Sequence, residues 1–74
     1  MQATINGKIY DTERASLVDA TVIHYDGDGV DVLKLYANGD HRFVVCEPDS
    51  GPAYIEPLDP DLSNWLAAAT GVGW

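Results

Sequence analysis

Two apolar, β-branched runs separated by an Asn-Gly pair constrain the fold of this chain more than any other feature. The runs are VDVLKLY (residues 30–36) and HRFVVC (residues 41–46), and Asn38-Gly39 lies between them. Asn and Gly tolerate positive φ, which a two-residue type I′ turn requires. The sequence therefore predicts a β-hairpin with Asn38 and Gly39 as its loop residues, which places Tyr36 opposite His41.

Side-chain alternation along this hairpin predicts two apolar faces. One face carries Leu33, Leu35, Val44 and Cys46, and the other carries Val32, Tyr36, Phe43 and Val45. Such a sheet needs cover on both faces, or cover on one face and a binding partner on the other.

The N-terminal third predicts three further short elements. Asn6-Gly7 between apolar residues indicates a second hairpin. Residues 11–18 fit one or two helical turns, with Asp11 or Thr12 as the N-cap. Residues 20–25 are β-branched and aromatic, which favours a strand, and the DGDG run at residues 26–29 favours a turn.

The C-terminal third predicts an edge strand and a helix. Residues 53–57 can form a strand, which the flanking prolines confine to the rim of the sheet. Asp59 is the expected N-cap of the helix, Pro60 its first residue and Gly71 the residue past its end. An apolar stripe at helical spacing consists of Leu62, Trp65, Leu66 and Ala69.

Together these elements predict an α+β fold in a single domain of residues 1–74. We expect an antiparallel β-sheet of about four to five strands, a C-terminal helix packed on one face and a short N-terminal helix.

The charge balance favours a basic partner. Four Lys and Arg against twelve Asp and Glu give a net charge of −8 and a pI of about 4.2. An acidic surface repels nucleic acid and anionic membranes and attracts cationic protein surfaces. Solubility alone is the simpler explanation of an acidic surface, and both explanations stay open at this point.

Cysteine usage and hydropathy predict a cytoplasmic protein. The single cysteine, Cys46, excludes an intramolecular disulfide, which small secreted folds usually need. The N-terminus does not have the pattern of a signal peptide, and no apolar run reaches the roughly 20 residues that span a bilayer. We therefore expect a cytoplasmic protein with no membrane partner.

Neither a metal nor a catalytic site is predicted. Counted from Asp26, the DGDGVD run places Val30 and Asp31 at the fifth and sixth positions of a calcium loop, where a ligand and a glycine are required. Cys46 lies in an apolar strand and fits a buried hydrophobic residue better than a nucleophile. We expect no cofactor and no enzymatic activity.

The carboxylates placed on turns, loops and strand ends are the candidate partner contacts. Between Phe43 and Trp74 the chain has five carboxylates and neither Lys nor Arg. The candidate contact residues are Asp26, Asp28, Glu47, Asp49, Glu56, Asp59 and Asp61. Trp74 is expected either to pack on the body of the protein or to serve at an interface.

Three segments resemble small proteins of phages and mobile elements. INGKIYDTERASLV is similar to the opening of such proteins, VLKLYANGDHRFVV to their sheet hairpin, and IEPLDPDLSNWLAA to their closing helix with Trp. Acidic proteins of this kind include anti-CRISPR proteins, several of which are DNA mimics.

The resemblance implies an inhibitor of a CRISPR-Cas effector complex of type I, with the type I-C surveillance complex as the narrower expectation. In the cytoplasm of a bacterial host cell, the inhibitor would occupy the cationic DNA-binding surface of a subunit. It would not bind nucleic acid itself, and we expect a monomer or weak homodimer. A second possibility is a protein-interaction module or homodimer that uses the apolar face with Val32, Tyr36, Phe43 and Val45.

Overall fold

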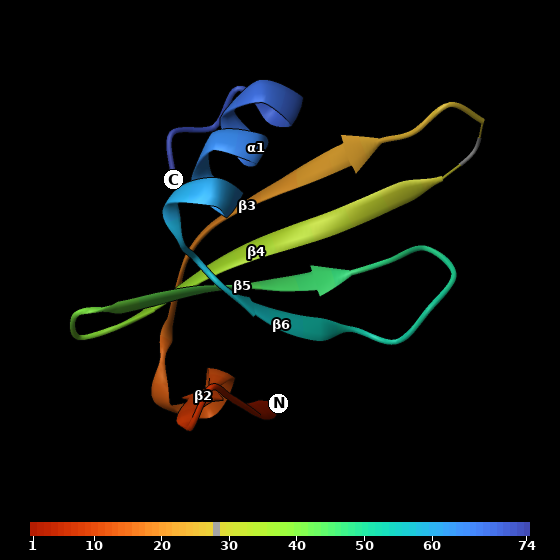
Figure 1. The fold of residues 1–74 in the computed structure, drawn as a ribbon. Coiled ribbons are helices and arrows are strands. Elements are labelled where there is room, and N and C mark those ends of the chain that lie inside the picture. The colour runs from red at the N-terminus through yellow and green to blue at the C-terminus, as the bar shows by residue number, and fades with distance from the viewer. Residues whose placement is uncertain (28) are drawn as a thin grey trace.

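The computed structural model describes residues 1–27 and 29–74 and confirms the α+β fold (Figure 1). A four-stranded antiparallel sheet in the order β3-β4-β5-β6 is accompanied by a two-stranded hairpin, β1-β2, and a C-terminal helix, α1. The elements are β1 (Gln2–Ile5), β2 (Lys8–Asp11), a 3₁₀ turn (Thr12–Arg14), β3 (Ser16–His24), β4 (Val30–Asn38), β5 (His41–Glu47), β6 (Tyr54–Pro57) and α1 (Pro60–Thr70).

The central hairpin β4-β5 forms, but its register differs from the prediction. Asn38 pairs with His41 and Tyr36 pairs with Phe43, so the two loop residues are Gly39 and Asp40. Gly39 has a φ of +60°, whereas Asn38 continues the strand. The first loop residue of a type II′ turn needs a positive φ, and Gly39 provides it. Asn38 is therefore not needed in the loop.

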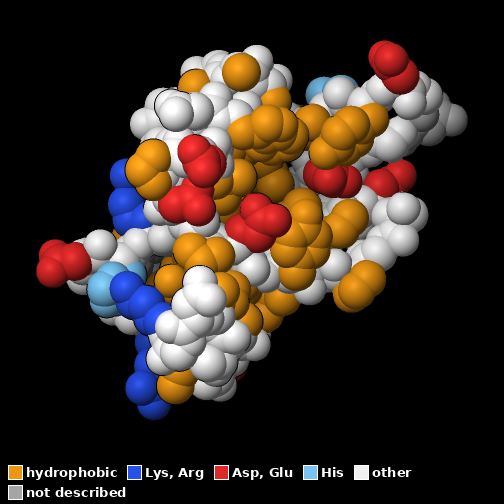
Figure 2. Space-filling model, in the orientation of Figure 1, with side chains coloured by type: hydrophobic (Ala, Val, Ile, Leu, Met, Phe, Trp, Pro, Cys, Tyr) orange, Lys and Arg blue, Asp and Glu red, His pale blue; other side chains and the backbone are white. Residues whose placement is uncertain are grey.

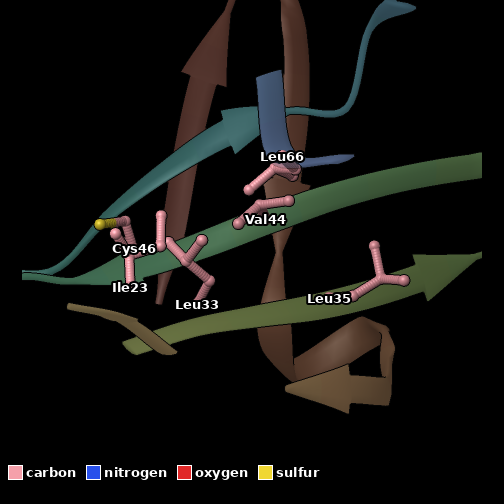
Figure 3. Close-up of a cluster of buried hydrophobic side chains, with 6 residues drawn as sticks. All are labelled: Ile23, Leu33, Leu35, Val44, Cys46 and Leu66. Carbon is pink, nitrogen blue, oxygen red and sulfur yellow. The ribbon is translucent and has the colours of Figure 1, made fainter. Parts of the chain in front are cut away.

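This change of register leaves the two faces as predicted. The loop moves one residue along the chain, from residues 38–39 to residues 39–40, so Tyr36 pairs with Phe43 instead of His41. Every β4 residue therefore has a partner shifted by two positions, and two is the period of side-chain alternation. Leu33, Leu35, Val44 and Cys46 still share one face, which packs on Leu66 of α1 and Ile23 of β3 (Figure 3). We call this side of the sheet the helix face.

The opposite side, here called the hairpin face, is covered by β1-β2. Phe43, Val45 and Ile55 are buried there, with residues of the N-terminal hairpin packed against them. The rings of Tyr10 and Tyr36 each lie 5.5 Å from the ring of Phe43. Each face of the sheet is therefore covered in part by another element of the same chain, the helix face by α1 and the hairpin face by β1-β2.

The short N-terminal helix is reduced to one 3₁₀ turn. The Asp11 side chain caps it by accepting a hydrogen bond from the backbone N–H of Glu13 at 2.9 Å. The helix prediction over residues 11–18 is wrong beyond Arg14, because the chain enters β3 at Ser16 and pairs along β4. Pairing with a long neighbouring strand outweighs a weak local helix preference.

The C-terminal helix has the predicted ends but a narrower buried stripe. Asp59 Oδ1 accepts a hydrogen bond from the Leu62 N–H at 2.8 Å, and Gly71 ends the helix with a φ of +76°. Leu66 is fully buried, whereas Trp65 is 50% exposed and Ala69 is exposed. The prediction that Trp65 belongs to the buried stripe is therefore wrong.

The C-terminal Trp74 packs on the body of the protein. Its side chain contacts the cluster on the helix face, and its indole N–H donates a hydrogen bond to Asp19 Oδ2 of β3 at 3.0 Å. Of the two alternatives for Trp74, the structure supports packing within the chain.

Candidate functional site

The helix face is only partly covered by α1, and the uncovered part forms a hollow. In Figure 1 the helix lies over β3, while the ends of the strands at the β3-β4 and β5-β6 loops extend beyond it. The hollow has a volume of about 370 Å³. Its floor consists of core side chains from three strands, β3, β4 and β5, and from α1: Ile23, Leu33, Val44, Cys46 and Leu66.

Three aromatic side chains line this hollow. Tyr25 follows β3, Tyr54 begins β6, and Trp65 lies on α1. Their exposed fractions are 46%, 45% and 50%, so each keeps about half of its surface open to solvent. Aromatic side chains that converge from three separate elements on a concave surface are typical of binding sites.

Two carboxylates complete the lining. Asp31 lies two residues before Leu33 in β4, so the two side chains point to the same face of the sheet. Glu56 of β6 pairs with Val44, which also places Glu56 on the helix face. Asp31 Oδ2 accepts a hydrogen bond from the Tyr25 hydroxyl at 3.0 Å. This bond raises the pKa of the Tyr25 phenol and links the wall of the hollow to its acidic group.

The thiol of Cys46 lies at the base of the hollow and is not activated. Burial raises its pKa, and the negative charges of Asp31 and Glu56 raise it further. A thiol kept protonated is a poor nucleophile. The same two charges make the hollow a place of negative potential, which disfavours anions.

No cation of the chain lines the hollow in the part that the structure describes. Figure 2 shows hydrophobic and acidic side chains together over the middle of this view, while the visible Lys and Arg side chains lie along its left side and lower end. Arg14 is 3.9 Å from Asp11, and Lys34 pairs with Glu47. Glu56 has no ion pair among the described residues.

The structure disperses most of the predicted contact residues. Among the predicted contact residues that the structure describes, Glu56 alone lines the hollow. Glu47 is paired with Lys34, and Asp59 is the N-cap of α1. The remaining described candidates, Asp26, Asp49 and Asp61, are exposed on loops and on the first turn of α1, and Asp28 lies outside the described residues.

Sequence reasoning missed four residues of the hollow: Tyr25, Asp31, Tyr54 and Trp65. A signal existed for Asp31, because its spacing of two from Leu33 places it on the same face of β4. The others depend on where α1 crosses the sheet, which the sequence pattern does not specify.

The described residues contain neither a group of metal ligands nor a helix that could span a membrane. Within residues 1–27 and 29–74, no three His, Cys, Asp or Glu side chains are grouped to hold a metal ion. In the same ranges, α1 is the one α-helix, and it is too short to cross a membrane.

Comparisons with protein-family models, with curated proteins and with solved structures find no match for this chain.

Proposed function

We propose that this protein is a non-enzymatic inhibitor that binds a cationic protein surface through its carboxylates. Following the resemblance to anti-CRISPR proteins, we place that surface on a DNA-binding subunit of a bacterial CRISPR-Cas effector complex of type I, in the host cytoplasm. The observation that carries the proposal is the uncompensated charge. The chain has a net charge of −8, and only one of the described candidate contacts, Glu47, is in an ion pair.

Electrostatic complementarity explains how such a protein would compete with DNA. Fixed carboxylates attract a cationic groove that normally contacts phosphates, and this attraction weakens as salt screens it. The carboxylates of Asp26, Asp49 and Asp61 are exposed and form no ion pair with the described residues, and Asp61 lies in the first turn of α1. Asp59 differs, because its side chain caps α1 and its replacement would damage the fold.

The test compares two charge-reversed variants of equal net charge. Asp49→Lys/Asp61→Lys alters candidate contacts, and Glu13→Lys/Asp40→Lys alters exposed acids elsewhere; each changes −8 by +4, to −4. Binding to a purified type I effector complex and displacement of its target DNA are measured at about 50 and 200 mM salt. We expect the first variant to lose at least tenfold in affinity and the control to lose less than threefold. Equal losses, or full inhibition by the first variant, would contradict the proposal.

A second candidate function is self-association, or binding to a host protein, through apolar side chains of the hairpin face. The face proposed from sequence needs correction, because Phe43 and Val45 are buried under β1-β2. A smaller strip stays open beside it, lined by Ala20, Thr21, Val22 and Val32. Binding through this strip should hardly respond to salt, which separates it from the acidic mode.

A further inference from the structure

We infer that the hollow on the helix face binds an arginine side chain of the partner protein. This inference rests on the proposed function, because the arginine is taken to belong to the cationic surface that the protein binds. The hollow combines aromatic walls, an apolar floor and two carboxylates, and these three features specify the same ligand chemistry.

The aromatic walls favour a cation. A cation over the face of Trp or Tyr, within about 6 Å of the ring centroid, is attracted by the ring quadrupole. Trp65, Tyr54 and Tyr25 border the hollow from α1, β6 and the end of β3, so a group inside meets aromatic side chains from three elements. Packed rings alone would suit an apolar ligand equally well.

The carboxylates exclude that apolar alternative. An apolar ligand would remove water from Glu56 and Asp31 without replacing their hydrogen bonds, which is costly for charged groups. An anion would be repelled by both. A cationic ligand that donates hydrogen bonds satisfies the carboxylates and the rings together.

Arginine fits this combination better than lysine. Its planar guanidinium stacks on aromatic faces and presents donors in a fixed fork, whereas the lysine ammonium is a compact, strongly hydrated point charge. Its apolar stem can lie on the floor formed by Leu33, Val44 and Leu66. At about 370 Å³ the hollow is near the lower end of ligand-site volumes, which suits a single side chain.

The direct test is an NMR titration of the full chain with N-acetyl-arginine amide. Two indole N–H signals serve as reporters: Trp65 borders the hollow, and Trp74, hydrogen-bonded to Asp19, is an internal control. We expect saturable shifts at Trp65 and at the backbone amides of Tyr54 and Cys46, with little change at Trp74. N-acetyl-citrulline amide, which has nearly the same shape without the charge, should cause no such shifts.

Matched variants separate a built site from general electrostatic attraction. Glu56→Gln keeps the size of the side chain at the hollow, and Asp61→Asn removes the same charge from the exposed first turn of α1. We expect at least a threefold loss of arginine affinity in Glu56→Gln and less than a 1.5-fold loss in Asp61→Asn. Trp65→Ala, checked for folding by circular dichroism, should abolish the shifts at Tyr54.

Several results would overturn the inference. These are equal shifts with citrulline, equal losses in Glu56→Gln and Asp61→Asn, or tighter binding of N-acetyl-lysine amide than of the arginine probe. If arginine does not bind while Asp49→Lys/Asp61→Lys weakens partner association, the inference fails and the proposed function stands. If arginine binds but that double variant keeps full association, the hollow is a cation site and the proposed function fails.

Discussion

The indole N–H of Trp74 donates a hydrogen bond to Asp19 Oδ2 at 3.0 Å and so joins the C-terminal residue to β3, 55 residues earlier in the chain. The segment after α1 is held to the sheet by this bond and by contact of Trp74 with the buried cluster. The bond from Trp74, together with one from the Ala20 N–H, lowers the pKa of the Asp19 carboxyl.

Replacing Trp74 by Phe should lower stability in a pH-dependent way. A carboxyl whose pKa is lower in the folded state than its unfolded value of about 3.9 contributes stability above that value. The contribution is lost as the pH falls through the folded pKa. The difference in free energy of unfolding between wild type and Trp74→Phe should therefore be larger at pH 6 than at pH 3. Urea unfolding at both pH values measures this difference, and an equal difference would show that the bond from Trp74 does not favour the ionised form of Asp19.

The faces of the sheet could be predicted from the sequence because side-chain alternation has a period of two. Leu33 and Val44 share a face whether the loop begins at Asn38 or at Gly39. The register itself could not be predicted, since Asn-Gly suits more than one placement in a tight turn. The helix ends were predictable from Asp59 and Gly71, which act through local backbone geometry.

The candidate site was less accessible to prediction. Glu56 was identified from its charge, and Asp31 could have been identified from its spacing of two residues from Leu33. The hollow itself exists because α1 leaves one end of the helix face open. That position is set by packing of Leu66 among residues of three strands. Trp65 shows the consequence, because its helical spacing indicates burial and its actual position is the rim of the hollow.

Leu66 should be the most sensitive position of α1. It is 0% exposed and packs in the cluster on the helix face, so Leu66→Ala leaves a cavity that the thin core cannot fill. We expect the free energy of unfolding to fall by about 3 kcal/mol. This is a large part of the roughly 4–11 kcal/mol that is typical of the unfolding free energy of a chain of this length. Trp65→Ala, at the neighbouring half-exposed position, should cost about 1 kcal/mol. Chemical denaturation followed by circular dichroism measures both, and similar losses would contradict the packing described.

The N-terminal hairpin should protect the chain from self-association. Ile5 packs against the cluster formed by Phe43, Val45 and Ile55, whereas Ile9 of the same hairpin is 63% exposed. Ile5→Ser should loosen the packing of β1-β2 and expose the hairpin face. We expect stronger binding of a dye specific for hydrophobic surface and a higher weight-average mass in analytical ultracentrifugation. Ile9→Ser is the matched control and should leave both unchanged. A monomeric Ile5→Ser variant with unaltered dye binding would show that the cover does not depend on this contact.

The two Asn-Gly pairs of the chain should respond differently to the same substitution. Asn6 has a φ of +51°, in the left-handed region, while Asn38 lies in extended backbone at the end of β4. Alanine lacks the local hydrogen bonding that makes this region tolerable for asparagine, so Asn6→Ala should cost about 1 kcal/mol. Asn38→Ala should change stability by less than about 0.5 kcal/mol, as at an ordinary surface position. Urea unfolding of the two variants tests the register of the central hairpin. If Asn38 occupied a type I′ loop with a positive φ, Asn38→Ala would lower the free energy of unfolding by as much as Asn6→Ala.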